Sequence, residues 1–148
     1  MIQRKQTVFL ILALVLTIVC LCMPLGHITP KGMGEDLVVT NLGIAQALNY
    51  TGWPLMALLL ITCPLNIFAI FAYSKRKMQM KLCTTCVVVC TLWYAYYLVS
   101  LMNTYTMLGA FRMNWTLCLP LVAIILYLMA HHAIKKDDDL VRSADRLR

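Results

Sequence analysis

Four long apolar runs alternate with shorter polar segments along the chain of 148 residues. The runs are 19 to 21 residues long, contain no Asp, Glu, Lys or Arg, and cover residues 7–25, 53–73, 82–102 and 116–134. The hydrocarbon core of a bilayer is about 30 Å thick, which a helix of about 20 apolar residues can cross. Because backbone polar groups cannot bond to water in lipid, each run is expected to be helical. The pattern predicts an all-α membrane protein, a bundle of four antiparallel transmembrane helices in a single domain over 1–148.

The two connections on one side of this bundle carry turn-forming and aromatic residues. The longer one, 26–52, begins with GHITPKGMG and continues with apolar residues at near-helical spacing, which a β-branched Val-Val-Thr run at 38–40 weakens. We expect a short amphipathic helix or an extended segment there, lying on the outer surface. The shorter connection is 103–115. Aromatic residues on this side suit an interfacial belt: Trp53, Tyr105, Phe111 and Trp115.

The basic residues are concentrated on the other side of the predicted bundle. Only Lys31 and Arg112 lie on the first side, and the remaining eleven of thirteen are Arg4, Lys5, Lys75, Arg76, Lys77, Lys81, Lys135, Lys136, Arg142, Arg146 and Arg148. Short segments rich in Lys and Arg stay in the cytoplasm. Both termini and the Ser74–Lys81 loop are therefore expected to be cytoplasmic.

Composition excludes several classes of protein. Hydrophobic residues make up 61% of the chain and charged residues 13%, against about 25% charged in a soluble domain. There is too little polar surface for a water-soluble monomer, and too much apolar character for a disordered chain. The net charge of +7 lies at the anionic cytoplasmic leaflet in this topology. We therefore expect the bilayer and its anionic lipids as partners, and no nucleic acid.

The tail after the fourth run, 135–148, reads KKDDDLVRSADRLR. We predict a short cytoplasmic helix over 137–147, because Asp137 can cap its start and because Leu140, Val141, Ala144 and Leu147 form one apolar stripe. This helix either lies in the membrane interface or docks a cytoplasmic partner. The candidate partner- or lipid-binding residues are Leu140, Val141, Arg142, Arg146 and Leu147.

The two ends of the chain carry a family resemblance. The opening MIQRKQ and the tail KKDDDLVRSADRLR resemble a family of uncharacterised four-span inner-membrane proteins of Bacteroidota, a domain of unknown function. The resemblance implies a location in the bacterial inner (cytoplasmic) membrane and no established activity. It supplies no catalytic residues.

Seven cysteines raise the question of redox chemistry. Cys83 and Cys86 form a C-x-x-C motif, as in quinone-linked thiol oxidoreductases built on four helices. However, the pair lies at the cytoplasmic end of the third run, where the compartment is reducing. With Cys90, Tyr94 and Tyr97 it follows one helical stripe, which favours helix packing. We expect that folding needs no disulfide.

Other candidate chemistry is weaker. His131 and His132 are adjacent, so they point about 100° apart on a helix, and we expect interfacial side chains rather than a metal site. In the middle of the second run, Pro64 cannot donate to the Leu60 carbonyl, and Asn66 can bond to a neighbouring helix. Pro64 and Asn66 are therefore a candidate structural pivot, meaning a point about which the second helix bends.

These observations favour a non-enzymatic integral inner-membrane protein, an accessory or scaffold subunit that docks a partner through its basic cytoplasmic rim. The partner is another protein or a further copy of the chain. The alternative is a small oligomeric transporter or lipid-handling protein, although ion pathways generally contain an ionisable residue within the bilayer. A membrane thiol oxidoreductase comes third. No catalytic residue, cofactor or metal is predicted.

Overall fold

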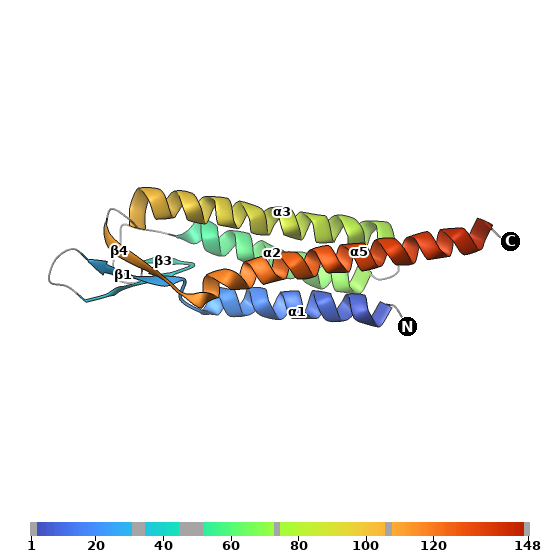
Figure 1. Ribbon diagram of the computed structural model, residues 1–148, viewed down its shortest axis with the longest axis horizontal. Coiled ribbons are helices and arrows are strands. Elements are labelled where there is room, and N and C mark those ends of the chain that lie inside the picture. The colour runs from blue at the N-terminus through green and yellow to red at the C-terminus, as the bar shows by residue number, and fades with distance from the viewer. Residues whose placement is uncertain (1–2, 31–34, 45–51, 73–74, 106–107, 147–148) are drawn as a thin grey trace.

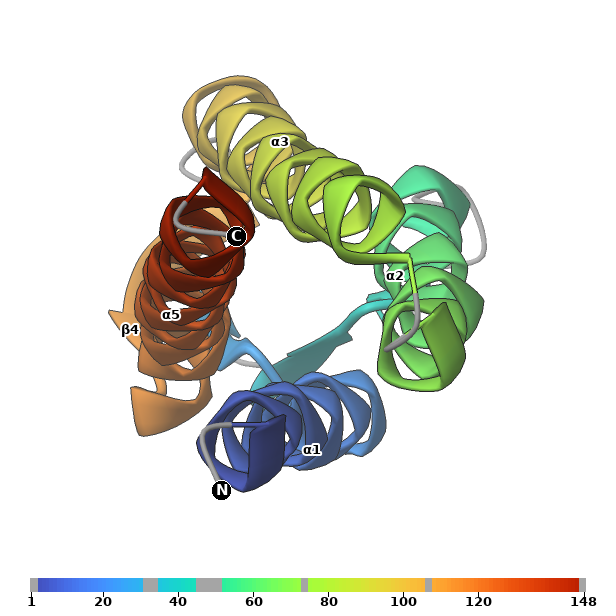
Figure 2. The same ribbon diagram turned by 90° about the vertical axis from the view of Figure 1, so that its right-hand side faces the viewer.

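The computed structural model describes residues 3–30, 35–44, 52–72, 75–105 and 108–146. These residues form four α-helices that lie side by side (Figure 1): α1 (Gln3–Cys22), α2 (Trp53–Phe71), α3 (Arg76–Ser100) and α5 (Leu119–Arg146). Around the bundle the order is α1, α2, α3, α5, so that each helix packs against two neighbours (Figure 2). The protein is therefore mainly helical, as the apolar runs predict.

Three of the helical segments are long and apolar enough to cross a membrane. They are α2; α3 together with the π-helical turn η2 (Leu101–Tyr105); and the 3-10 turn η3 (Trp115–Cys118) together with α5 as far as Val141. The apolar part of α1, Gln6–Cys22, is shorter and extends about 25 Å at 1.5 Å per residue. The fourth crossing remains a prediction.

Small residues lie between the helices together with larger buried side chains such as Trp93 and Tyr127, and many other large apolar residues face outwards. Ala13, Ala69, Ala123 and Ala130 are fully buried in one core cluster, where their size lets helix backbones approach closely. The outer surface carries many large apolar side chains, among them Ile11, Leu60, Val88 and Leu128. This distribution is typical of helices that pack against each other inside lipid.

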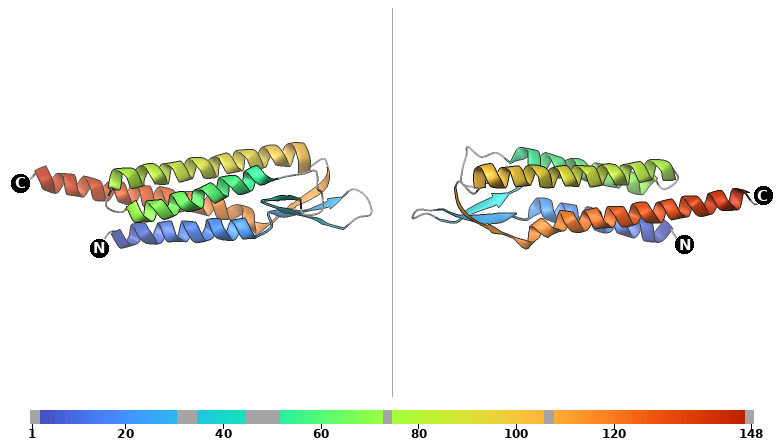
Figure 3. Two further views of the ribbon diagram at one scale, coloured as in Figure 1. Left: turned by 180° about the vertical axis from the view of Figure 1, so that it is seen from behind. Right: turned by 45° about the horizontal axis from the view of Figure 1, so that its top comes forward.

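A small antiparallel sheet lies at the end of the bundle away from the start of α1 and the end of α5 (Figure 3). Its strands are β1 (Gly26–Pro30), β2 (Leu37–Thr40), β3 (Gly43–Ile44) and β4 (Gly109–Met113), in the order β3-β2-β1-β4. The all-α prediction is wrong in this respect. The extended alternative for the 26–52 connection is correct for the strands, because the β-branched residues of β2 favour a pleated surface.

At the basic end, α3 and α5 extend beyond the apolar runs that predicted them. Arg76–Lys81 belongs to α3 instead of forming a loop, and the described part of the tail, 135–146, belongs to α5 instead of forming a separate helix. Neither Gly nor Pro follows Ile134 in this helix, so nothing interrupts it. Asp137 lies within α5 and pairs with Arg76, which corrects its expected role as a helix cap.

Candidate functional site

Polar contacts join three helices at the basic end of the bundle, the end at which α1 starts and α5 finishes (Figure 1). An Nη atom of Arg76 lies 3.1 Å from Oδ2 of Asp137, and the other Nη donates to the Asp137 carbonyl at 3.3 Å. Gln6 Nε2 donates to the carbonyl of Ala133 at 3.1 Å. The start of α3 and the start of α1 are therefore both fastened to α5 at this level.

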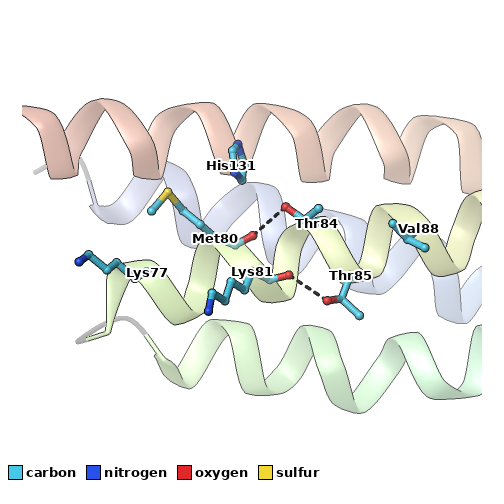
Figure 4. Close-up of a pocket in the computed structure, with 7 residues that line it drawn as sticks. All are labelled: Lys77, Met80, Lys81, Thr84, Thr85, Val88 and His131. Carbon is cyan, nitrogen blue, oxygen red and sulfur yellow. Dashed lines mark hydrogen bonds between the residues drawn. The ribbon is translucent and has the colours of Figure 1, made fainter.

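A groove of about 750 Å³ opens between α3 and α5 beside these contacts (Figure 4). Its volume falls within the range of about 300–1,000 Å³ that is usual for small-molecule sites. We call it the α3–α5 groove, and its lining residues are Lys77, Met80, Lys81, Thr84, Thr85, Val88 and His131. The first six recur every three or four residues, so they share one face of α3, and His131 completes the wall from α5.

The groove is cationic at one end and apolar at the other. Lys77 lies at the basic end and Val88 at the opposite end (Figure 4). The hydroxyl of Thr84 donates to the Met80 carbonyl at 3.1 Å, and that of Thr85 to the Lys81 carbonyl at 2.9 Å. Because these protons are used within α3, the middle of the wall offers mainly methyl groups to a ligand.

A second hollow of about 440 Å³ lies along α5. It is lined by His132, Lys135, Lys136, Asp139 and Leu140. The two adjacent histidines thus border different hollows. In the part of the chain that the structure describes, no group of three or more His, Cys, Asp or Glu side chains could hold a metal ion.

The last part of α5, residues 138–146, extends beyond the other helices, and we call it the overhang (Figure 1). Leu140 is 49% exposed and Val141 is 42% exposed, so the bundle does not cover them. The side chains of Arg142 and Arg146, and the whole of Leu147, lie outside the described residues. The structure therefore places two of the five candidate docking residues, both on the surface.

The cysteines of the C-x-x-C motif are part of the core. Cys83, Cys86 and Cys90 are fully buried among residues of all four helices, and all seven cysteine sulfurs in the structure are free. A disulfide-bearing substrate has no access to Cys83 or Cys86 in this arrangement. Their position fits the predicted packing stripe.

Asn66 links three helices inside the bundle. It is fully buried on α2, and its Nδ2 donates to the Leu10 carbonyl of α1 at 3.1 Å and to the Tyr127 hydroxyl of α5 at 2.8 Å. The expected bond to a neighbouring helix is therefore present, and α2 continues through Pro64. Bending about Pro64 and Asn66 remains a prediction.

Sequence reasoning missed the α3–α5 groove and the role of Tyr127. Lys77 and Lys81 were interpreted only as topology signals, although their spacing with Thr84 and Val88 already indicates one helix face. Tyr127 is a polar residue in the middle of an apolar run, which is a signal for an interhelical hydrogen bond. No sequence pattern brings His131 to the groove, because it comes from another helix.

The fold thus defines a mainly helical protein with three helices able to cross a membrane and a small sheet at one end. Over residues 2–147 the chain matches the family described as Domain of unknown function (DUF4293), and it belongs to that family. A search among curated proteins gives no match. The predicted resemblance to an uncharacterised family is confirmed, while the bacterial group and the inner-membrane location remain predictions.

Proposed function

We propose that this protein is a non-enzymatic component of the bacterial inner membrane, an accessory or scaffold subunit that docks a cytoplasmic protein. The overhang is the observation that carries the proposal. It is a continuous helix that projects past its neighbours and exposes Leu140 and Val141. Four spans, with both termini in the cytoplasm, place this projection on the side where soluble partners are found.

The position of Leu140 along α5 favours a protein over lipid as the cover for these side chains. The hydrocarbon core of a bilayer is about 30 Å thick, and each headgroup layer adds about 5–7 Å. Leu140 lies six residues beyond Ile134, the last apolar residue of the run, and so about 9 Å further along the axis. Acyl chains do not reach that level. A helix continuous with a span also points out of the bilayer instead of lying along it.

Lipid handling is the second candidate, because the α3–α5 groove has the size and the divided polarity of a lipid site. A thiol oxidoreductase is disfavoured by the complete burial of Cys83 and Cys86.

Docking is tested by changing the exposed residues of the overhang. We expect the L140D/V141D variant to lose a stoichiometric partner that copurifies with the full chain from native membranes. Each large apolar side chain contributes roughly 1.5–3 kcal/mol when fully buried, so the loss should exceed tenfold. The control is S143D, which adds a charge at another exposed position of the overhang. Retention of the partner by L140D/V141D would contradict the proposal, and so would the absence of any stoichiometric partner.

The orientation is tested with reporter fusions. Enzymes that are active only in the periplasm, or only in the cytoplasm, are fused after Lys31 and after Lys136. The excess of basic residues at one end predicts opposite signals from the two positions. Equal signals would mean an even number of crossings between the two positions and would contradict the four-span topology.

A further inference from the structure

We propose that the α3–α5 groove is a binding site for one anionic phospholipid of the cytoplasmic leaflet. Its phosphate would bind between Lys77, Lys81 and His131, and one acyl chain would follow the groove towards Val88. The inference rests on the proposed orientation of the bundle and on lipid handling as the second candidate function, but not on the docking role of the overhang.

The groove lies at the depth where a lipid changes from charged to apolar. Lys81 immediately precedes the apolar run 82–102, so Lys77 and Lys81 are level with the headgroups. From Lys77 to Val88 the face extends about 16 Å along α3, which takes it from the headgroup layer well into the hydrocarbon. A water-soluble anion would contact only the first part of this surface.

The charge at the mouth of the groove suits a phosphate. Lys77 and Lys81 are both exposed, and Arg76 is neutralised by Asp137, 3.1 Å away. The first turn of α3 contains no acidic residue, and the side chain of its N-cap residue, Lys75, makes no capping hydrogen bond, so neither of these offsets the positive end of the helix dipole. Basic pockets between transmembrane helices on the cytoplasmic side are typical sites for anionic headgroups.

The apolar part of the groove suits an acyl chain. Met80 and Val88 supply apolar side chains, and the hydroxyl protons of Thr84 and Thr85 are used by carbonyls of α3. Since these protons are already donated to carbonyls within α3, a polar ligand would not find them as donors, and the surface favours hydrocarbon. The groove lies between two helices, with His131 of α5 next to Met80 and Thr84 of α3 (Figure 4).

Native mass spectrometry of the full chain tests the headgroup part of the proposal. The protein is exchanged into detergent containing either dioleoyl-phosphatidylglycerol or dioleoyl-phosphatidylcholine, which differ only in the headgroup. We expect one tightly retained phosphatidylglycerol, and about 10- to 30-fold weaker binding in the K77Q/K81Q variant. The control K135Q/K136Q removes the same charge from the same end of the bundle but outside the groove, and should keep the lipid. Equal loss in both variants would show diffuse attraction and overturn the site.

The acyl-chain part is tested with V88W, which fills the groove without changing its charge. Val88 is exposed, so the larger side chain should not disturb the core. The control V99W places the same substitution at another exposed position of α3. We expect V88W to weaken retention of phosphatidylglycerol at least tenfold and V99W to leave it unchanged. If V88W instead converts a dimer to a monomer without affecting lipid, the groove is a contact between two copies and the proposal is wrong. Equal retention by V88W and wild type would overturn it as well.

Discussion

Replacing Asn66 with leucine is expected to lower the free energy of unfolding by about 1–3 kcal/mol. Asn66 is fully buried and donates to Leu10 of α1 and to Tyr127 of α5. Interhelical hydrogen bonds in membrane proteins contribute about 0.6–1.7 kcal/mol each. Leucine fills a similar volume but donates nothing, so it also leaves the Tyr127 hydroxyl without this donor.

A double-mutant cycle separates this bond from general packing. The single variants N66L and Y127F are compared with N66L/Y127F by unfolding in mixed micelles, followed by circular dichroism. We expect a coupling energy of about 0.6–1.7 kcal/mol, because the double variant loses one shared bond only once. Y96F is the control, since Tyr96 lies on the outer part of α3 and is 38% exposed, and it should change stability by less than about 0.5 kcal/mol. Strictly additive effects would mean that the Asn66–Tyr127 bond does not hold α2 against α5.

The helices could be predicted from hydropathy, but their ends at the basic end could not. Hydropathy reports which residues prefer hydrocarbon, so it places the boundary of the third run after Lys81. The helix itself begins at Arg76, because Lys, Met and Gln are good helix formers in water as well. In the same way α5 passes Ile134, the end of the fourth apolar run, and continues into the overhang.

The sheet illustrates a second limit of sequence reasoning. β1 pairs with β4, which follows it by about 80 residues, in a register from Gly26 opposite Met113 to Pro30 opposite Gly109. Local patterns do not encode such a pairing, since the bundle brings the two connections together. This explains why β4 was not predicted at all.

The aromatic residues at the sheet end of the bundle are partly exposed and partly buried, and this difference also depends on the tertiary fold. Trp53 and Trp115 are exposed, as expected of an interfacial belt, but Tyr105 is buried. Its ring stacks on Phe111 of β4, with 5.5 Å between the centroids. All four side chains have an apolar body that suits either position, and only the tertiary fold decides between them.

The α3–α5 groove shows how much of a site depends on two helices being placed side by side. The face of α3 that carries Lys77 and Lys81 can be deduced from periodicity alone. His131 borders the groove only because α5 packs beside α3, where Arg76 pairs with Asp137 about 1.7 turns beyond His131. Sequence analysis predicts the two parts separately: Lys77 and Lys81 as basic topology signals, and His131 as an interfacial side chain.

Replacing Gly109 with alanine is expected to separate β4 from β1, at a cost of about 3 kcal/mol. A Cβ atom at this position would lie 2.1 Å from the Thr29 carbonyl oxygen and 3.0 Å from the Cα of Pro30. Both are backbone atoms of β1, so no side chain can rotate away, and the strands must move apart. Overpacking of this kind typically costs 1–3 kcal/mol, and displacing β4 also weakens the stacking of Phe111 on Tyr105, worth about 0.5–1.5 kcal/mol.

The measurement is amide hydrogen exchange of β1 and β4 in the full chain. In the wild type, the hydrogen-bonded amides of Gly26–Thr29 and Gly109–Met113 should be protected, and in G109A they should exchange at least tenfold faster while α2 and α3 keep their protection. The matched control is A110V, one residue along the same strand, where the side chain is exposed and an added β-branch suits the strand. If the amides of β1 and β4 are as well protected in G109A as in A110V, the close approach of β4 to Thr29 does not determine the pairing of these two strands. Loss of protection in the helices as well would mean that the sheet holds the bundle together, because the strands would then be needed to keep α1 and α5 in place.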